Sequence, residues 1–350
     1  TKSVERVAHL MGYDEGDVPT CASVLEAAYT RLEATFEAFR SRTRAGDTPA
    51  VSHVPFKAAD TCSVCQDESS SPLITCVECE RAYHLACVTP TLSQVPRGVW
   101  VCPTCLVHTG GDFGFEDGET HSLYSFWQRC HAFEQIWAER AGWDDWHSLT
   151  LSEREDRVEA EFWRLVHCMD EHVDVEYGAD VHSTTHGHAS PTMESDPLNV
   201  YARSGWNLNN MPILADSLLR YIRSEISGMT APWIYIGMMF SAFCWHNEDH
   251  YTYSINYQHW GATKTWYGVP GADAEAFEAA MERIAPELFA ACPDLLLQLV
   301  TMMSPALARR EGVRMYACNQ RPNEFVVTYP KAYHSGLNQG FNLNEAVNFA

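Results

Sequence analysis

The chain has 350 residues, a formal net charge of −22 and no apolar run long enough to cross a bilayer. This acidity disfavours contact with nucleic acid over most of the surface, but it suits a basic polypeptide partner. The length predicts two or three domains, and neither a membrane span nor a signal peptide is expected.

The first 39 residues show a helical pattern. Apolar side chains recur at steps of three and four residues on one face: Leu25, Ala28, Tyr29, Leu32, Phe36 and Phe39. Residues 4–13 together with 25–29 resemble the second half of an ARID domain, a helical DNA-binding module. We therefore expect a partial ARID-like segment at 1–44, or a generic helical pair, followed by a linker at 45–60. Binding of DNA would need the complete ARID of a parent protein.

Four closely spaced pairs of metal-ligand residues follow: Cys62 and Cys65, Cys76 and Cys79, His84 and Cys87, and Cys102 and Cys105. Eight ligands are enough for two closed tetrahedral zinc sites. Disulfides are the alternative, but they would need an oxidising compartment. So short a stretch cannot build an adequate apolar core, and the metals are expected to supply much of its folding energy.

The order of seven cysteines and one histidine, with Trp100 two residues before the seventh ligand, resembles a PHD finger, expected at 61–107. The resemblance implies interleaved ligation, with one zinc on Cys62, Cys65, His84 and Cys87 and the second on Cys76, Cys79, Cys102 and Cys105. PHD fingers commonly bind the histone H3 tail as an added strand, for which Leu73 and Ile74 are suited. Ala82 stands where readers of trimethyl-lysine often carry a cage tryptophan. Acidic candidates that favour an unmodified lysine are Asp67, Glu68, Glu78 and Glu80.

Residues 108–120 are rich in glycine and aspartate and predict a second linker. Helices are predicted at 123–140, 153–170, 273–289 and 294–303, the third opening at Asp273 as N-cap. Strands are predicted at about 233–241, 250–258, 264–268, 324–330 and 345–349. Cysteines outside the finger have no metal spacing and are expected to be reduced thiols: Cys21, Cys130, Cys168, Cys244, Cys292 and Cys318.

An aromatic, strand-like stretch carries His246-Asn247-Glu248, and a further histidine, His334, lies near the C-terminus. A His-x-Glu followed much later by His is the ligand pattern of the two-histidine, one-carboxylate triad, which occupies one face of an Fe(II) octahedron. Period-two geometry puts the first histidine and the glutamate on the same side of a strand. Short strands around such a site predict a mainly β fold with helical flanks, a double-stranded β-helix barrel of the cupin kind.

The same parity continues through Ser254 and Asn256 to Lys264. If it holds, these polar side chains face inward, where an unpaired ammonium is costly. Lys264 then needs an anion, and in an Fe(II) oxygenase the natural one is the distal carboxylate of 2-oxoglutarate. The alternative is a surface lysine on an edge strand.

Residues 246–270 closely resemble the JmjC histone lysine demethylases, and within them the JARID group, whose substrate is methylated lysine 4 of histone H3. Further matching strings lie at 176–180, 204–212, 235–238, 330–342 and 344–349. The resemblance implies that His246, Glu248 and His334 bind iron. It implies 2-oxoglutarate contacts from Tyr177, Phe243, Ser254, Asn256, Lys264, Trp266 and Asn338, and a methyl-lysine pocket lined by Tyr235 and Asn348. Core packing for Phe243 and Trp266, and a turn cap for Asn338, are the alternatives.

The resemblance thus implies a nuclear, Fe(II)- and 2-oxoglutarate-dependent histone demethylase at 121–350, with the histone H3 tail and chromatin complexes as partners. Oxidative decarboxylation of 2-oxoglutarate would drive hydroxylation of an N-methyl carbon, after which formaldehyde leaves. The zinc finger that follows the barrel in JARID enzymes is missing from the sequence, so this domain is expected to be incomplete at its C-terminal side. Two alternatives are a JmjC hydroxylase of another side chain and a non-catalytic chromatin adaptor acting through the finger.

Overall fold

The computed structural model describes residues 61–67, 72–77, 79–88, 91–92, 95, 100–108, 115, 117–168, 171 and 173–350. The predicted ARID-like segment, its linker and part of the second linker lie outside these residues. Two compact units divide the chain: Thr1–Pro55 with Asp117–Ser148, and Phe56–Glu116 with Leu149–Ala350. Within the described part, no helix combines the length and apolarity that crossing a membrane requires.

The cysteine-rich segment is built on a short antiparallel hairpin. Strand β1 (Leu73–Thr75) pairs with β2 (Ala82–His84), and the helical turn η1 (Leu85–Cys87) and helix α3 (Pro103–His108) follow. Its small core includes Ile74, Tyr83 and Trp100, with the last two rings edge-on at 5.4 Å. So few apolar side chains leave the fold dependent on the metal-ligand clusters described below.

In the first unit, the helix predicted at 123–140 is confirmed as α4 (Leu123–Arg140), and a helical turn η2 (Trp146–Ser148) follows. Ser122 caps the helix: its hydroxyl accepts a hydrogen bond from the backbone N–H of Ser125, whose side chain bonds back to the cap. The indole of Trp146 donates to Glu134 at 3.0 Å, which fixes the turn against the helix.

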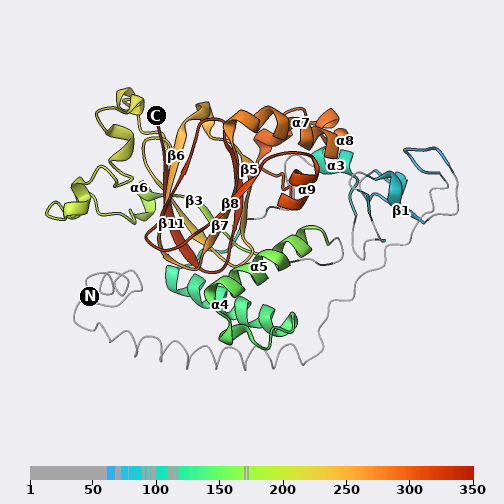
Figure 1. Ribbon diagram of the computed structural model, residues 1–350, viewed down its shortest axis with the longest axis horizontal. Coiled ribbons are helices and arrows are strands. Elements are labelled where there is room, and N and C mark those ends of the chain that lie inside the picture. The colour runs from blue at the N-terminus through green and yellow to red at the C-terminus, as the bar shows by residue number, and fades with distance from the viewer. Residues whose placement is uncertain are drawn as a thin grey trace. The chain divides into compact units, whose positions relative to one another are not determined.

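Two antiparallel sheets form the larger domain (Figure 1). The first contains, in spatial order, β5 (Ala242–His246), β10 (Tyr333–Asn338), β7 (Lys264–Val269) and β8 (Tyr316–Gln320). The second contains β3 (Gly178–His182), β4 (Trp233–Gly237), β11 (Asn342–Phe349), β6 (Tyr253–Gly261) and β9 (Phe325–Thr328). Side chains from both sheets meet in a common interior, which confirms the predicted mainly β, cupin-like fold.

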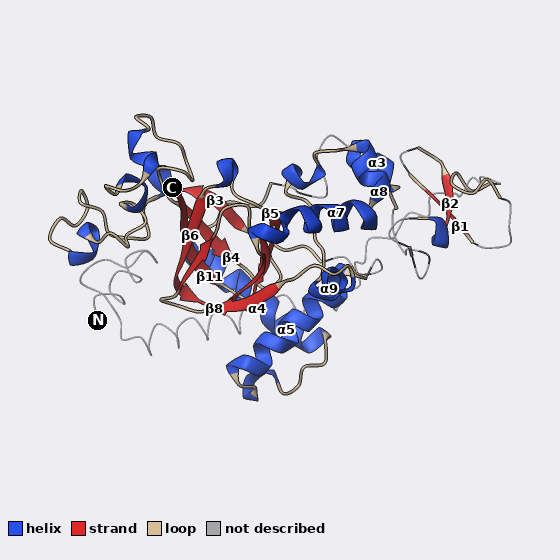
Figure 2. Cartoon of the chain, turned by 45° about the horizontal axis from the view of Figure 1, so that its top comes forward, coloured by secondary structure: helices blue, strands red, loops and turns tan. Residues whose placement is uncertain are grey.

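Helices lie outside the sheets (Figure 2). They are α5 (Leu151–Val166), α6 (Ser183–His186), α7 (Ala274–Ile284), α8 (Pro286–Ala291) and α9 (Pro305–Arg310). Short 3-10 turns are η3 (Val200–Arg203), η4 (Met211–Ile213), η5 (Leu218–Tyr221), η6 (Asp249–Tyr251), η7 (Gly271–Asp273) and η8 (Leu295–Gln298).

Two of these helices brace the four-stranded sheet from outside. The carboxylate of Glu155 on α5 is buried and accepts hydrogen bonds from Arg321 and Thr263. Phe277 on α7 packs between the rings of Trp245 on β5 and Tyr333 on β10, at 5.0 and 4.8 Å. Helices α5 and α7 therefore pack on the outer face of the four-stranded sheet, and its inner face carries the polar side chains of the candidate site.

Several predicted elements are wrong in detail. The helix at 294–303 is reduced to the single turn η8, and the helix at 273–289 is divided because Pro286 begins a new helix. Asp273 is the N-cap residue of α7, as predicted, but its side chain makes no capping hydrogen bond and accepts from Arg314 at 2.8 Å instead. The strand at 250–258 begins three residues later because η6 precedes it, and strands β3, β8 and β10 were not predicted.

Of the described cysteines outside the finger, Cys168, Cys244, Cys292 and Cys318 are free thiols, as predicted. Cys21 lies outside the described residues.

Candidate metal and cosubstrate sites

The end of β5 and the middle of the first sheet bring the three predicted iron ligands together. His246 closes β5, Glu248 follows two residues later, and His334 lies opposite His246 on β10. One ligand atom from each residue lies within 4.8 Å of the other two, and Nε2 of His334 is 3.1 Å from a carboxylate oxygen of Glu248. Two imidazoles and one carboxylate gathered on one side form a donor set that fits Fe(II).

Outer hydrogen bonds orient all three side chains. Nδ1 of His246 donates to the carbonyl of Cys244 at 2.7 Å, and Nδ1 of His334 donates to that of Ala332 at 3.0 Å. Carbonyls only accept, so both Nε2 atoms remain available for a metal. Asn348, expected in the methyl-lysine pocket, donates from Nδ2 to Glu248 at 2.7 Å. It therefore contacts the carboxylate of the predicted iron ligand directly.

The electrostatics of the site keep its groups in their metal-binding forms. Burial, with the neighbouring His334, lowers the pKa of His246 to about 4. Burial alone would raise the pKa of Glu248, but interactions with His334 first, and then with His246 and Asn348, together outweigh it and lower that pKa to about 2. Near neutral pH the site thus holds a neutral imidazole on His246 and an ionised carboxylate on Glu248.

A β-bulge places Phe243 on the same inner face as His246. The two residues are three positions apart, so strict alternation would set them on opposite faces. However, β10 advances by two residues, from His334 to Gly336, where β5 advances by three. Gly336 makes room for the ring, since a Cβ there would lie 2.6 Å from a ring carbon of Phe243. The ring then contacts Trp266 at 4.8 Å.

Lys264 is 1% exposed, which excludes the surface alternative. Its Nζ donates to the hydroxyl of Tyr177 at 3.0 Å and lies 5.2 Å from the ring centre of Phe243. Among the described residues, no carboxylate pairs with this ammonium. Burial lowers the pKa of Lys264 to about 7, because removing a charged amine from water is costly. A bound anion would relieve that cost.

The other predicted site residues face the same interior. Ser254 pairs with Thr328 through their hydroxyls at 2.5 Å, and buried Asn256 bonds to neighbouring amides. Asn338 is fully buried and bonds to Ser241, so it is not a simple turn cap. Tyr235 donates to Asp180 at 2.8 Å, and its ring lies 6.2 Å from that of Tyr177.

Two buried amides of this interior, Gln320 and Asn344, were not predicted as site residues, and neither was the exposed Asp180, which accepts the hydrogen bond of Tyr235. They carry no motif. The even-numbered parity of polar residues along 342–348 would have indicated Asn344, but β8 was not predicted, and Gln320 was missed with it.

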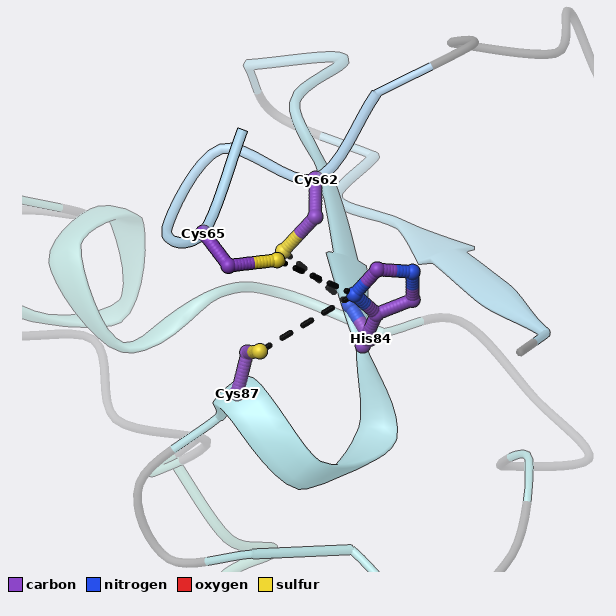
Figure 3. A group of neighbouring side chains, drawn as sticks. All are labelled: Cys62, Cys65, His84 and Cys87. Atoms are coloured by element: carbon purple, nitrogen blue, oxygen red, sulfur yellow. Dashed lines mark hydrogen bonds between the residues drawn. The ribbon is translucent and has the colours of Figure 1, made fainter. Parts of the chain in front are cut away.

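The finger holds two separate clusters of ligand atoms. Cys62, Cys65, His84 and Cys87 converge around Nδ1 of the histidine, which lies 3.3 Å from Sγ of Cys65 (Figure 3). Backbone hydrogen bonds support the thiolates: burial would raise the pKa of Cys62, but backbone N–H groups of Cys65 and His84 help lower it to about 6. The second cluster contains Cys76, Cys79, Cys102 and Cys105. The grouping is the interleaved one, and both donor sets fit tetrahedral zinc.

Comparison with known proteins identifies the class. Residues 233–349 match the model of the JmjC domain, hydroxylase, and residues 62–105 match that of the PHD-finger. The chain therefore carries a JmjC domain and a PHD finger, which fits the triad, the two facing sheets and the two-cluster finger described above.

Among curated proteins, the chain is 46% identical over 299 residues to lysine-specific demethylase 5D of Homo sapiens, an alignment covering 82% of this chain and 19% of the relative. It is 45% identical over 313 residues to lysine-specific demethylase 5B of Gallus gallus, covering 86% of this chain and 20% of the relative. The chain thus spans about a fifth of the length of these relatives.

Proposed function

We propose that the protein is an Fe(II)- and 2-oxoglutarate-dependent demethylase of a histone lysine, acting on methylated lysine 4 of histone H3. The observation that carries the proposal is the buried Lys264, without a carboxylate partner among the described residues, in the same interior as the His246–Glu248–His334 triad. A metal-binding face and an isolated buried cation together suit a cosubstrate that carries a chelating end and a second carboxylate. The similarity to two lysine-specific demethylases supports the choice of substrate class.

In this proposal each side chain has a defined task. His246, Glu248 and His334 would hold iron, which supplies activation of oxygen when bound. Lys264, with Tyr177, would bind the distal carboxylate, while Phe243 and Trp266 exclude water from it. Ser254, Asn256 and Asn338 would orient the remainder of 2-oxoglutarate, and Tyr235 would line the methyl-lysine pocket. The protein contributes geometry and orientation, and the oxidation itself belongs to the metal and cosubstrate.

Mass spectrometry of histone H3 peptides methylated on different lysines, incubated with the protein, Fe(II), ascorbate and 2-oxoglutarate, tests this function. We expect stepwise loss of methyl groups from lysine 4 together with formaldehyde. A stable gain of one oxygen on the peptide without formaldehyde would indicate a JmjC hydroxylase instead. An unchanged peptide with no succinate would indicate a non-catalytic adaptor.

We further propose that the finger reads the histone H3 tail with lysine 4 unmodified. Strand β1 pairs with β2 along one edge, and within the described residues its other edge is open to an added strand. Asp67 and Glu80, with the acidic Glu68 and Glu78 of the sequence, would attract the tail's ammonium groups. Titration of the finger with unmodified and trimethylated H3 peptides should show tighter binding of the former.

These activities would place the protein in the nucleus, within complexes that act on chromatin. Two structural zinc ions and one catalytic iron are the metals the donor sets accommodate. Direct contact with DNA would require a complete ARID, of which the sequence resembles one half. Elemental analysis of the purified protein tests the metal content.

A further inference from the structure

Three amide side chains form a buried cluster behind Trp266: Asn256 on β6, Gln320 on β8 and Asn344 on β11. Gln320 belongs to the four-stranded sheet, and the two asparagines belong to the five-stranded sheet. The cluster therefore crosses the interior of the barrel. The family resemblance implies a 2-oxoglutarate contact for Asn256, whereas it assigns no role in cosubstrate binding to Gln320 or Asn344.

Groups that can only donate or only accept determine which way Gln320 points. The indole N–H of Trp266 only donates, and it lies 2.9 Å from Oε1 of Gln320. Nε2 of Gln320 donates at 3.1 Å to the backbone carbonyls of Asn256 and Glu324, which only accept. Both ends of the amide thus require the same orientation, and the reverse one would oppose donor to donor and acceptor to acceptor.

The orientation of the Gln320 amide in turn favours one orientation of the Asn256 side-chain amide. The Oδ1 of Asn256 accepts from Nδ2 of Asn344 at 2.8 Å, and it shares the two hydrogens of the Gln320 amino group, 3.1 Å away, with the two backbone carbonyls. With two donors facing that oxygen, the amino group of Asn256 must point away from the cluster. Among the described residues nothing accepts a hydrogen bond from this Nδ2, and the atom keeps some exposed surface although Asn256 is largely buried.

We propose that Gln320 and Asn344 are positioning residues that hold the amide of Asn256 with its amino group presented to a carboxylate of 2-oxoglutarate. The amino group donates and a carboxylate only accepts, whereas a reversed amide would set oxygen against oxygen. Trp266, which lies beside Lys264, donates the first hydrogen bond of this chain, to Gln320. The same hydrogen bonds therefore orient both the Trp266 ring and the amide of Asn256. The inference rests on the proposed function, because it requires 2-oxoglutarate to bind here.

The test is the variant Gln320→Glu, which keeps the side-chain length. One carboxylate oxygen still accepts from Trp266, but the other faces the carbonyls of Asn256 and Glu324 and the Oδ1 of Asn256. Of these three acceptors only the side-chain amide of Asn256 can turn over to offer a donor. Calorimetric titration of 2-oxoglutarate into Mn(II)-loaded protein measures affinity without turnover. We expect affinity to fall on the order of ten- to a hundredfold, the cost of a hydrogen bond to a charged group. Affinities for Mn(II) and for methylated peptide should stay unchanged.

A double-mutant cycle separates positioning through Asn256 from a general structural role. Asn256→Ala alone should weaken 2-oxoglutarate binding, and adding Gln320→Glu to it should cost less than about a further twofold. Gln258→Glu is the matched control, since Gln258 is also a buried glutamine of this interior, bonded to the carbonyl of Ala262 and not to Asn256. It should leave 2-oxoglutarate affinity within about twofold of wild type.

Losses that multiply in the double variant would overturn the inference, as would wild-type affinity in folded Gln320→Glu. If that variant does not fold by circular dichroism, Gln320→Met takes its place. It frees the amide of Asn256 without a buried charge, and we expect about a two- to tenfold loss that disappears in the Asn256→Ala background. Failure of the wild-type protein to bind 2-oxoglutarate would overturn the proposed function, and the inference with it.

Discussion

At the residue scale, burial of the Lys264 ammonium carries an electrostatic cost, because a charged amine is removed from water. Lys264 is 1% exposed and donates a hydrogen bond to the hydroxyl of Tyr177. Among the described residues, no carboxylate forms an ion pair with it. Lys264→Met would leave the distal carboxylate of 2-oxoglutarate unpaired. Removing one partner of a buried charge pair costs roughly 3–5 kcal/mol, so we expect a loss of affinity on the order of a hundredfold or more.

The measurement is the 2-oxoglutarate dependence of formaldehyde release. Iron content should be unchanged in Lys264→Met because lysine is not a ligand. Lys264→Arg should restore binding in part, since a planar guanidinium cannot take the place of a compact ammonium without moving the ligand. An unchanged apparent constant in the Met variant would show that this lysine does not meet the cosubstrate.

Lys264 also predicts a pH dependence of cosubstrate binding. Its pKa in the folded protein is lowered to about 7 from 10.5, so the ammonium that a carboxylate needs predominates below pH 7 and declines above it. Affinity for 2-oxoglutarate should therefore be highest at the acidic side and weaken by up to about tenfold per pH unit above 7. In the absence of 2-oxoglutarate, the stability of the fold has the opposite pH dependence to cosubstrate affinity. The unfolded chain binds more protons between pH 7 and 10.5, so this group makes the free energy of unfolding increase with pH over that window.

Titration of the Mn(II)-loaded protein with 2-oxoglutarate at several pH values checks this prediction. Lys264→Arg is the control, because a guanidinium stays charged throughout the range and should flatten the profile. A wild-type profile as flat as that of the Arg variant would contradict the assignment.

At the element scale, the bulge in β5 depends on Gly336 of β10. A Cβ at this position would lie 2.1 Å from the carbonyl oxygen of Thr265 and 2.6 Å from the ring of Phe243, so one strand or the ring must move. Gly336→Ala should lower the free energy of unfolding by about 1–3 kcal/mol and displace Phe243 from Lys264. Gly268→Ala on β7 is the matched control, because nothing lies within 4 Å of a Cβ there.

Thermal unfolding of both variants, followed by titration with 2-oxoglutarate, provides the measurement. We expect a lowered midpoint and weaker cosubstrate binding for Gly336→Ala and wild-type behaviour for Gly268→Ala. Equal behaviour of the two variants would mean that the close contact at Gly336 has no part in shaping the site.

The finger gives the second prediction at this scale. Cys102→Ala opens the cluster that also contains Cys76, whose Sγ accepts a hydrogen bond from the backbone N–H of residue 102 at 3.1 Å. With so small a core, losing one zinc should unfold the segment 62–105. Native mass spectrometry should find fewer than two tightly bound zinc ions, while iron binding to the barrel persists. Two retained zinc ions would show that the ligands are grouped differently.

Sequence reasoning reached the metal ligands more easily than the strands that carry them. His-x-Glu and the paired cysteines have fixed spacings set by coordination chemistry, so they are visible without a structure. Strands β8 and β10 carry Gln320, His334 and Asn338 toward the interior, so they lack the alternation of apolar and polar residues that indicates a strand. The bulge that turns Phe243 inward also depends on pairing between distant strands, which no local pattern reveals.

At the scale of the whole molecule, the finger and the barrel share no ligand, so the two kinds of metal site can be emptied separately. Glu248→Ala should therefore abolish turnover and leave two zinc ions in the finger. The formal charge of −22 on the whole chain suits binding of a basic histone tail, and this electrostatic attraction weakens as the salt concentration rises. Elemental analysis with an assay of succinate checks the variant, and wild-type succinate production would refute the iron assignment.

The central claim is that one interior holds Fe(II) and 2-oxoglutarate together. Anaerobic addition of both to the protein, followed by visible absorption spectroscopy, tests it most directly, because the charge-transfer band of an Fe(II)–2-oxoacid chelate requires both in contact. We predict this band in the wild-type protein, its loss in Glu248→Ala, and its appearance in Lys264→Met at much higher 2-oxoglutarate concentrations. Absence of the band in wild-type protein that retains its zinc would contradict the account.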